Sequence, residues 1–344
     1  MKFLLPFFDD SSLIFAAHMK TLLLERGYDA VVAQMVNADL SDRQITNHLA
    51  LGPDYVISET FFASREILTF DGVVLCKVPS TVRKLLSNGS YKRSRRRPAY
   101  VAFQPGIEFF PELGRRSRLD FDVVFLCSYD QMISYKADMR PSKPQHVSYG
   151  HPYFIKPSRF AANTSKKVYF FAQAVSPVTL SSRIFMVDLL KTMAVRHPER
   201  EFIIKLRHMP EENLSHVHKE EFSYPWIVDN HFSNLPTNLS FSSCSTRQAL
   251  EDAEMAVACT STALMEAISQ GVPSLAYIDY VENYQDRCAV ALRRDFSESG
   301  LIVSLSKLMD LEFCRLDRQW MKLYFRGEDL FEELEEAVAD FQSF

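Results

Sequence analysis

The sequence is organised around residues 255–276, which read MAVACTSTALMEAISQGVPSLA. The apolar run Met255–Ala258 predicts a buried strand, and the hydroxyl residues Thr260–Thr262 are placed to cap a following helix that Gly271 ends. A strand, a polar turn and a helix in this order bring backbone N–H groups to the carboxyl edge of a parallel sheet, where they suit a phosphate. The stretch therefore predicts a phosphate site, although many α/β proteins have such turns without a ligand.

Glu266 favours the ligand interpretation. It lies four residues after Thr262, so both side chains fall on the same face of the predicted helix. From that face its carboxylate can reach a sugar or ribose hydroxyl held over the turn.

Composition limits the classes of function. With 344 residues, 47% apolar and 24% charged, the chain is typical of a soluble globular protein with two domains. A net charge of −4 argues against a dedicated nucleic-acid binder. Six scattered cysteines without a CxxC pair predict reduced thiols and a cytoplasmic location. The short apolar N-terminus predicts a first core strand rather than a signal peptide, and no apolar run is long enough to predict a transmembrane helix.

Apolar strand-like runs alternate with helical segments along the whole chain, which predicts α/β domains with doubly wound parallel sheets. The rhythm weakens in the polar segment 157–165, where we place a domain boundary. The predicted domains are residues 1–155, residues 166–326 and a C-terminal helix at 327–344 that packs back across the first domain. Two similar domains facing a central cleft are expected.

Three carboxylates in the first domain are candidate general bases. Asp9 and Asp10 follow the first predicted strand, and Glu108 follows a later one, just after Gly106. Ligands of open α/β sheets bind at the carboxyl ends of strands, where a carboxylate can deprotonate an acceptor hydroxyl. Each of the three can equally well cap the helix that follows. Both interpretations stay open.

The densest charge run is Lys92–Arg97, followed by Arg115, Arg116 and Arg118. Such a run is most often a solvated loop, but it can also attract an anionic acceptor or an anionic membrane surface. Because no aromatic residues alternate with these charges, we do not expect nucleic acid here.

Cations also follow a strand of the second domain. Lys205 and Arg207 share one face of the strand end and His208 follows them, a set that suits a phosphate or pyrophosphate. Gln173, after the first strand of this domain, can bond a base or a phosphate. Neither GxGxxG nor GxxxxGK[ST] occurs, and the histidines have no carboxylate or cysteine partner at metal-ligand spacing, so no metal site is expected.

Together these motifs resemble the C-terminal half of GT-B glycosyltransferases. The matching residues are Gln173, Lys205-Leu206-Arg207, Thr260-Ser261-Thr262-Ala263, Glu266-Ala267 and Gly271-Val272-Pro273. The set is similar to bacterial transferases associated with nonulosonic acids (sialic, legionaminic or pseudaminic acid) and, more distantly, to capsule sialyl- and Kdo-transferases. The chain departs from the His-Pro motif of the latter, because Met209 separates His208 from Pro210.

The resemblance implies a GT-B fold with two Rossmann-like domains, and an enzyme that moves a nonulosonic acid from a CMP-activated donor to a hydroxyl of a bacterial surface glycan or protein. It implies inversion in a single displacement, with CMP-sugar as co-substrate and no further cofactor. The cysteines indicate a cytoplasmic enzyme, and the run Lys92–Arg97 can bring it into peripheral contact with an anionic inner membrane. The expected donor-binding residues are Gln173, Lys205, Arg207, His208, Thr260, Ser261, Thr262 and Glu266, and the expected bases are Asp9, Asp10 and Glu108. The alternatives are a UDP-sugar 2-epimerase of the same fold and a non-catalytic assembly protein that binds nucleotide sugars.

Overall fold

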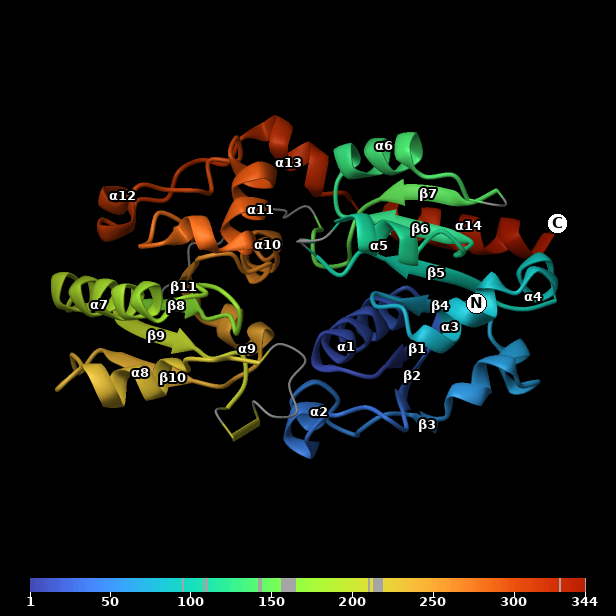
Figure 1. The fold of residues 1–344 in the computed structure, drawn as a ribbon, viewed down its shortest axis with the longest axis horizontal. Helices are drawn as coiled ribbons and strands as arrows, with labels where there is room; N and C mark the ends of the chain where they lie inside the picture. Colours follow the sequence, from blue (N-terminus) through green and yellow to red (C-terminus); the bar gives the residue numbers. More distant parts are fainter. Residues whose placement is uncertain are drawn as a thin grey trace. The chain divides into compact units, whose positions relative to one another are not determined.

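The computed structural model divides the chain into two compact α/β units. Unit 1 comprises Met1–Ile155 and Leu323–Phe344, and unit 2 comprises Lys156–Lys322. The structure describes residues 1–94, 96–106, 108, 111–141, 144–155, 165–209, 211–212, 219–327 and 329–343. Each unit has a parallel sheet of its own with helices around it (Figure 1).

Unit 1 is built on a seven-stranded sheet in the order β3-β2-β1-β4-β5-β6-β7, in which every neighbouring pair is parallel. Its strands are β1 (Lys2–Phe7), β2 (Asp29–Met35), β3 (Tyr55–Ile57), β4 (Gly72–Leu75), β5 (Ala99–Phe103), β6 (Val123–Leu126) and β7 (His146–Tyr149). The central strands are buried throughout because helices cover both faces, which explains their continuous apolar sequence.

The helices of unit 1 form one apolar layer on each face of the sheet. They are α1 (Asp10–Glu25), α2 (Asp42–His48), α3 (Ser80–Ser87), α4 (Gly89–Arg93), α5 (Pro111–Ser117), α6 (Tyr129–Asp138), α14 (Asp329–Ser343) and the 3-10 helices η1 (Glu59–Ala63) and η2 (Glu66–Thr69). Alternation along β1 shows the two layers, because Phe3 and Leu5 pack in one core with α1 and α14, whereas Leu4 packs in the other with α3 and α6.

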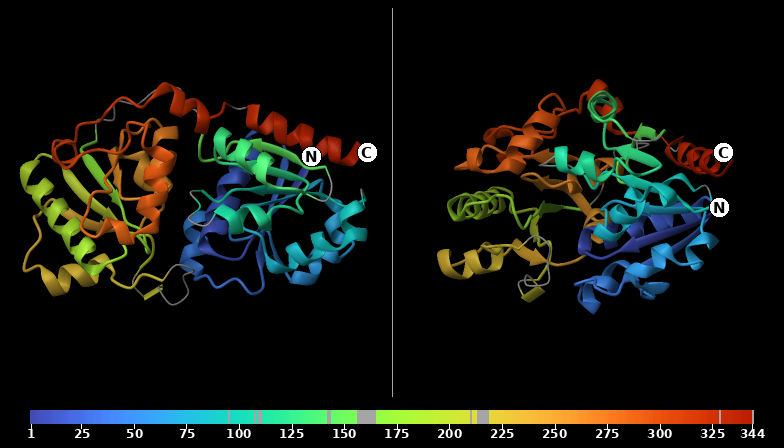
Figure 2. Two further views of the ribbon diagram at one scale, coloured as in Figure 1. Left: turned by 45° about the horizontal axis from the view of Figure 1, so that its top comes forward. Right: turned by 45° about the vertical axis from the view of Figure 1, so that its right-hand side comes forward.

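Helix α14 belongs to unit 1 although it follows unit 2 in the chain, and both views of Figure 2 show it beside the strands of unit 1. It contributes six buried apolar residues to the core that it shares with α1: Leu330, Phe331, Leu334, Ala337, Val338 and Phe341. The guanidinium of Arg26 stacks on the Phe331 ring at 4.0 Å. In the part of the chain that the structure describes, no helix has both the length and the apolarity to cross a membrane.

Unit 2 has a five-stranded parallel sheet in the order β10-β9-β8-β11-β12. Its strands are β8 (Lys167–Phe171), β9 (Glu201–Lys205), β10 (Leu239–Ser242), β11 (Ala253–Ala258) and β12 (Ser274–Ala276). Its helices are α7 (Leu180–Arg196), α8 (Tyr224–His231), α9 (Thr246–Glu251), α10 (Ala263–Ser269), η4 (Asn283–Gln285), α11 (Arg287–Phe296), α12 (Leu305–Met309) and α13 (Arg318–Tyr324), which begins in unit 2.

Both sheets reverse their direction of winding once. In unit 1 the chain moves outward from β1 to β3 and then crosses back to β4, so the reversal lies between β1 and β4. In unit 2 it lies between β8 and β11. The predicted doubly wound parallel sheets are therefore confirmed. Because ligands of such sheets bind beyond the carboxyl ends of the strands at the reversal, these two places are where a site is expected.

Candidate functional site

The reversal in unit 2 is bridged by Gln173 and Thr260. Gln173 follows β8 and Thr260 follows β11, so the two residues lie on either side of the gap between these strands. The Gln173 Oε1 atom accepts the Thr260 backbone N–H at 3.2 Å and also the Thr260 hydroxyl, while Gln173 Nε2 donates to the Thr260 carbonyl at 3.3 Å. These three bonds fix both residues at the carboxyl edge of the sheet.

The hydroxyl-rich turn differs from its predicted capping role. The N-cap of α10 is Thr262, whose side chain makes no capping bond, and Thr260 is directed to Gln173 instead. Only Ser261 acts locally, since its Oγ accepts the backbone N–H of Ala263 at 3.2 Å. Gly271 ends the helix as predicted, with a φ of 76° that a residue with a side chain rarely adopts. The capping expectation is therefore wrong for Thr260 and Thr262.

Lys205 and Glu266 come together at the same edge. Lys205 is the last residue of β9 and is 8% exposed, and Glu266 lies in the first turn of α10. Burial raises the pKa of the Glu266 carboxyl to about 7, and the positive charge of Lys205 opposes this rise. A carboxyl group with this pKa is divided between its charged and neutral forms near pH 7, so it can either accept or donate a hydrogen bond.

Arg207 and His208 lie in the turn that follows β9. Arg207 is partly exposed, whereas His208 is 3% exposed. The turn is closed by the Glu212 carboxylate, which accepts the backbone N–H of Met209 at 2.9 Å. All the predicted donor-binding residues thus lie at one edge of the unit 2 sheet. Except for Glu266 in the first turn of α10, they lie at or just after the ends of its three central strands, β8, β9 and β11.

Sequence reasoning missed a buried cation beneath this edge. Arg183 lies on α7 with 1% of its surface exposed, and its carboxylate partner is Glu220, with 2.5 Å between Nη1 and Oε1. The sequence contained a signal of this burial, because Arg183 falls on the apolar face of α7 with Met186, Val187 and Leu190. A charged residue at such a position requires buried partners.

The reversal in unit 1 is bridged by an ion pair. Asp9 follows β1 and Lys77 follows β4, and Lys77 Nζ lies 2.7 Å from Asp9 Oδ2. Asp9 is also the N-cap of α1, since its Oδ1 accepts the backbone N–H of Ser12 at 2.8 Å and the Ser12 hydroxyl at 2.7 Å. Asp9 therefore caps α1, as one of the two interpretations of the sequence predicted. Its role as a base stays a prediction.

The other two predicted bases lie at the same edge of unit 1. Asp10, in the first turn of α1, is 9% exposed. Glu108 forms an ion pair with the buried Arg118, whose Nη1 lies 3.3 Å from Glu108 Oε2 and whose Nη2 donates to Oε1. Asp9 and Glu108 thus each form an ion pair with a cation of unit 1.

Part of the predicted basic surface is internal. Lys92 and Arg97 are 6% and 4% exposed and form ion pairs with Asp120 and Asp122. Arg118 pairs with Glu108, as above. Within Lys92–Arg97, Arg93 and Arg96 are the exposed cations among the described residues, and residue 95 lies outside them.

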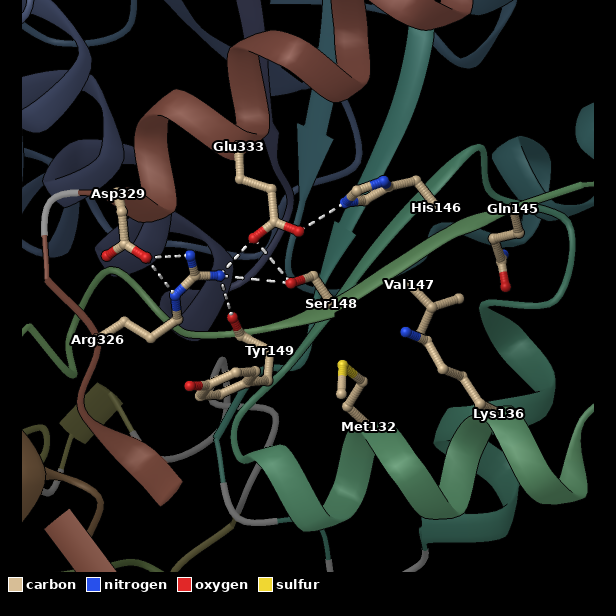
Figure 3. A pocket seen from close by; sticks show the side chains of 10 residues that line it. All are labelled: Met132, Lys136, Gln145, His146, Val147, Ser148, Tyr149, Arg326, Asp329 and Glu333. Atoms are coloured by element: carbon tan, nitrogen blue, oxygen red, sulfur yellow. Dashed lines mark hydrogen bonds and ion pairs between the residues drawn. The ribbon is translucent and has the colours of Figure 1, made fainter. Parts of the chain in front are cut away.

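An open pocket of about 590 Å³ in unit 1 contains none of the predicted site residues. It lies between β7, α6 and the start of α14 (Figure 3). At its wall the Glu333 carboxylate accepts hydrogen bonds from His146 at 2.9 Å, from Ser148 at 2.8 Å and from Arg326. Burial alone would raise the pKa of Glu333, but these three donors lower it to about 2. The network ties α14 to the edge strand β7.

Comparisons with known proteins were made for the whole chain. No curated protein matches it. A structure described as a putative UDP-N-acetylglucosamine 2-epimerase from Listeria monocytogenes is similar, with a TM-score of 0.59, 12% identity, and 99% of this chain and 97% of that one covered. A UDP-GlcNAc 2-epimerase from Neisseria meningitidis bound to UDP-GlcNAc has a TM-score of 0.57, 15% identity, and coverage of 98% and 100%. The spinosyn forosaminyltransferase SpnP has a TM-score of 0.53, 13% identity, and coverage of 98% and 99%.

These similarities confirm the predicted GT-B fold, with Rossmann-like parallel sheets of seven and five strands. A family model matches residues 9–341, nearly the entire sequence. The chain belongs to the family described as "Putative glycosyltransferase (DUF6716)".

Proposed function

We propose that this glycosyltransferase binds its nucleotide-sugar donor at the carboxyl edge of unit 2. The observation that carries the proposal is the bridge between Gln173 and Thr260 at the reversal of the sheet, the place where doubly wound sheets bind ligands. Lys205 and Glu266 lie beside it and supply a cation and a hydrogen-bonding carboxyl group. Similar structures include a UDP complex and a UDP-GlcNAc complex, which agrees with a nucleotide ligand.

The donor that we propose is a CMP-activated nonulosonic acid. Such a donor carries one phosphate and one sugar carboxylate, and Lys205 and Arg207 provide a matching pair of cations. During transfer the acceptor oxygen bonds to the anomeric carbon, and the bond from that carbon to the phosphate oxygen breaks. The electron pair leaves with CMP, whose growing negative charge these cations stabilise. The proton of the acceptor hydroxyl passes to a carboxylate.

Asp9, Asp10 and Glu108 remain the proposed bases. All three follow strands of the unit 1 sheet at its carboxyl edge, where doubly wound sheets bind ligands. The proposed acceptor is a hydroxyl of a surface glycan or protein, and contact with an anionic membrane surface would use Arg93 and Arg96.

A binding experiment tests the donor site. Purified protein is titrated with CMP, UDP and TDP by calorimetry, beside Lys205→Met and the control Lys322→Met, which replaces an exposed lysine of α13. We expect CMP to bind, Lys205→Met to weaken it about tenfold or more, and Lys322→Met to leave it unchanged. Preference for UDP or TDP would overturn the CMP donor, and absence of binding by all three would overturn the nucleotide site.

A second candidate is a UDP-sugar 2-epimerase, because two of the similar structures are described as such enzymes. An epimerase converts its sugar nucleotide without an acceptor. Incubation with UDP-sugar alone therefore separates the two functions, since only the epimerase would form a new sugar nucleotide. If CMP-sugar binds but no acceptor from a broad panel is glycosylated, a non-catalytic assembly protein is favoured.

A further inference from the structure

Arg183 uses every hydrogen-bond donor of its guanidinium inside unit 2. Nε donates to the carbonyl of Pro177 at 2.7 Å, and Nη2 donates to the carbonyls of Gln173 and Ala174 at 2.9 and 2.6 Å. Nη1 donates to Glu220 Oε1 at 2.5 Å and to the carbonyl of Phe222 at 2.9 Å. A guanidinium has five N–H groups, so no donor is left for a substrate.

Three of these five bonds end on one loop, residues 173–177, which connects β8 to α7. The loop begins with Gln173, whose side chain bridges the sheet reversal to Thr260. Arg183 therefore fixes the backbone of the residue whose side chain forms the bridge. The Glu220 and Phe222 contacts join the same loop to the segment that follows β9.

The loop is also held from its other side. Ser176 is 1% exposed and donates to Asp286 Oδ2 at 2.7 Å. Asp286 is the N-cap of α11 and accepts the backbone N–H of Cys288 at 2.8 Å. Arg183 itself packs over the ring of the buried Tyr224 at 5.2 Å. These contacts leave the loop few alternative conformations.

We propose that Arg183 is a positioning residue for nucleotide binding, which acts by holding loop 173–177 so that Gln173 and Thr260 stay at the sheet reversal. This inference rests on the proposed nucleotide site in unit 2. Arg183 does not touch the nucleotide. Its effect is preorganisation, since a loop that must be ordered on binding lowers affinity.

Arg97 in unit 1 offers a matched control. It is also buried and makes five hydrogen bonds, to both oxygens of Asp122 and to the carbonyls of Tyr91, Lys92 and Pro98. Arg183→Lys and Arg97→Lys each keep the charge but give up most of these bonds. We expect both variants to lower the melting temperature. A difference between them in nucleotide affinity would therefore reflect where each arginine lies in the fold and not a general loss of stability.

The test compares the Kd of CMP, UDP and TDP for the parent protein, Arg183→Lys, Arg97→Lys and Ser176→Ala, at a temperature below every melting transition. We expect Kd to rise about tenfold in Arg183→Lys, less in Ser176→Ala and not at all in Arg97→Lys. Hydrogen exchange of the amides of residues 173–176 should quicken in the first two variants only.

Each other result has a defined meaning. Unchanged affinity in both Arg183→Lys and Ser176→Ala would overturn the positioning role while leaving the nucleotide site intact. An equal loss in Arg97→Lys would overturn it as well, because the effect would then be general destabilisation. If Arg183→Lys fails to fold, the Ser176→Ala result decides alone. If the parent protein binds none of the nucleotides, the proposed function itself fails.

Discussion

Lys77 and Asp9 join the ends of two adjacent strands, β4 and β1, through an ion pair of 2.7 Å. Asp9 is almost fully buried, whereas the Lys77 side chain keeps 22% of its surface exposed. The pair occupies the reversal of the unit 1 sheet, the position that the neutral pair Gln173 and Thr260 occupies in unit 2. At the same position in the sheet, unit 1 thus has an ion pair and unit 2 has hydrogen bonds between neutral side chains.

Replacing Lys77 by Met should destabilise the protein by about 1–3 kcal/mol, because it leaves the buried Asp9 carboxylate without its cation. The double variant Asp9→Asn with Lys77→Met should recover most of this loss, since Asn also caps helices well. Urea unfolding of the two single variants and the double variant measures the coupling free energy. Additive effects would show that the pair contributes nothing to stability.

Glu266 should make the protein less stable as the pH rises from about 4.5 to about 7. In this range the unfolded chain has lost the Glu266 proton while the folded protein retains it, and stability falls with pH where the folded state binds more protons. Glu266→Gln removes this dependence and should raise the free energy of unfolding at pH 8 by about 1–2 kcal/mol, with little change at pH 4.5.

Urea unfolding of the parent protein and Glu266→Gln at several pH values provides the measurement. Glu254→Gln is the control, because Glu254 lies in the same unit and forms an ion pair with Arg200. Parallel pH profiles for the parent protein and Glu266→Gln would contradict the raised pKa.

Glu333 should have the opposite pH dependence. Its pKa in the folded protein is about 2, below the ordinary value of 4.5, so the stabilisation is fully present above about pH 4.5 and is lost as the pH falls towards 2. Glu333→Gln should cost about 1–3 kcal/mol at pH 7 and make the remaining acid dependence shallower. The exposed Glu332 of the same helix provides the control Glu332→Gln. The measurement is the melting temperature of both variants between pH 2 and 7. Equal pH profiles for Glu333→Gln and Glu332→Gln would contradict this role of Glu333.

Among Asp9→Asn, Asp10→Asn and Glu108→Gln, the variant that removes the base should lower kcat for transfer by about 100-fold or more, with donor affinity within about twofold of the parent protein. Asp9→Asn and Glu108→Gln should also lower stability, because each variant loses an ion pair. Product formation from a CMP-sugar and calorimetric donor binding are measured on the same preparations. Full activity in all three variants would rule out our choice of base.

The sequence predicted the strands well because their apolar runs are continuous, as in Met255–Ala258, which lies within β11. It also placed Gln173 and Thr260 after strands. It could not show that these two residues meet, because strand order is a long-range property and they lie 87 positions apart. Arg97 illustrates a different limit, since its charged neighbours suggested a surface and only the fold reveals the buried carboxylate of Asp122.

Helix α14 has a consequence for synthesis on the ribosome. The core that α14 shares with α1 lacks six of its apolar side chains until the last residues of the helix emerge, about 190 residues after β7. At about 5–20 residues per second this interval is roughly 10–40 s. During that time the apolar side chains of the unit 1 sheet and of α1 that pack against α14 lack this partner, whereas unit 2 emerges in full before α14 begins. Unit 2 can therefore be the first to complete its fold, although most of unit 1 is made before it.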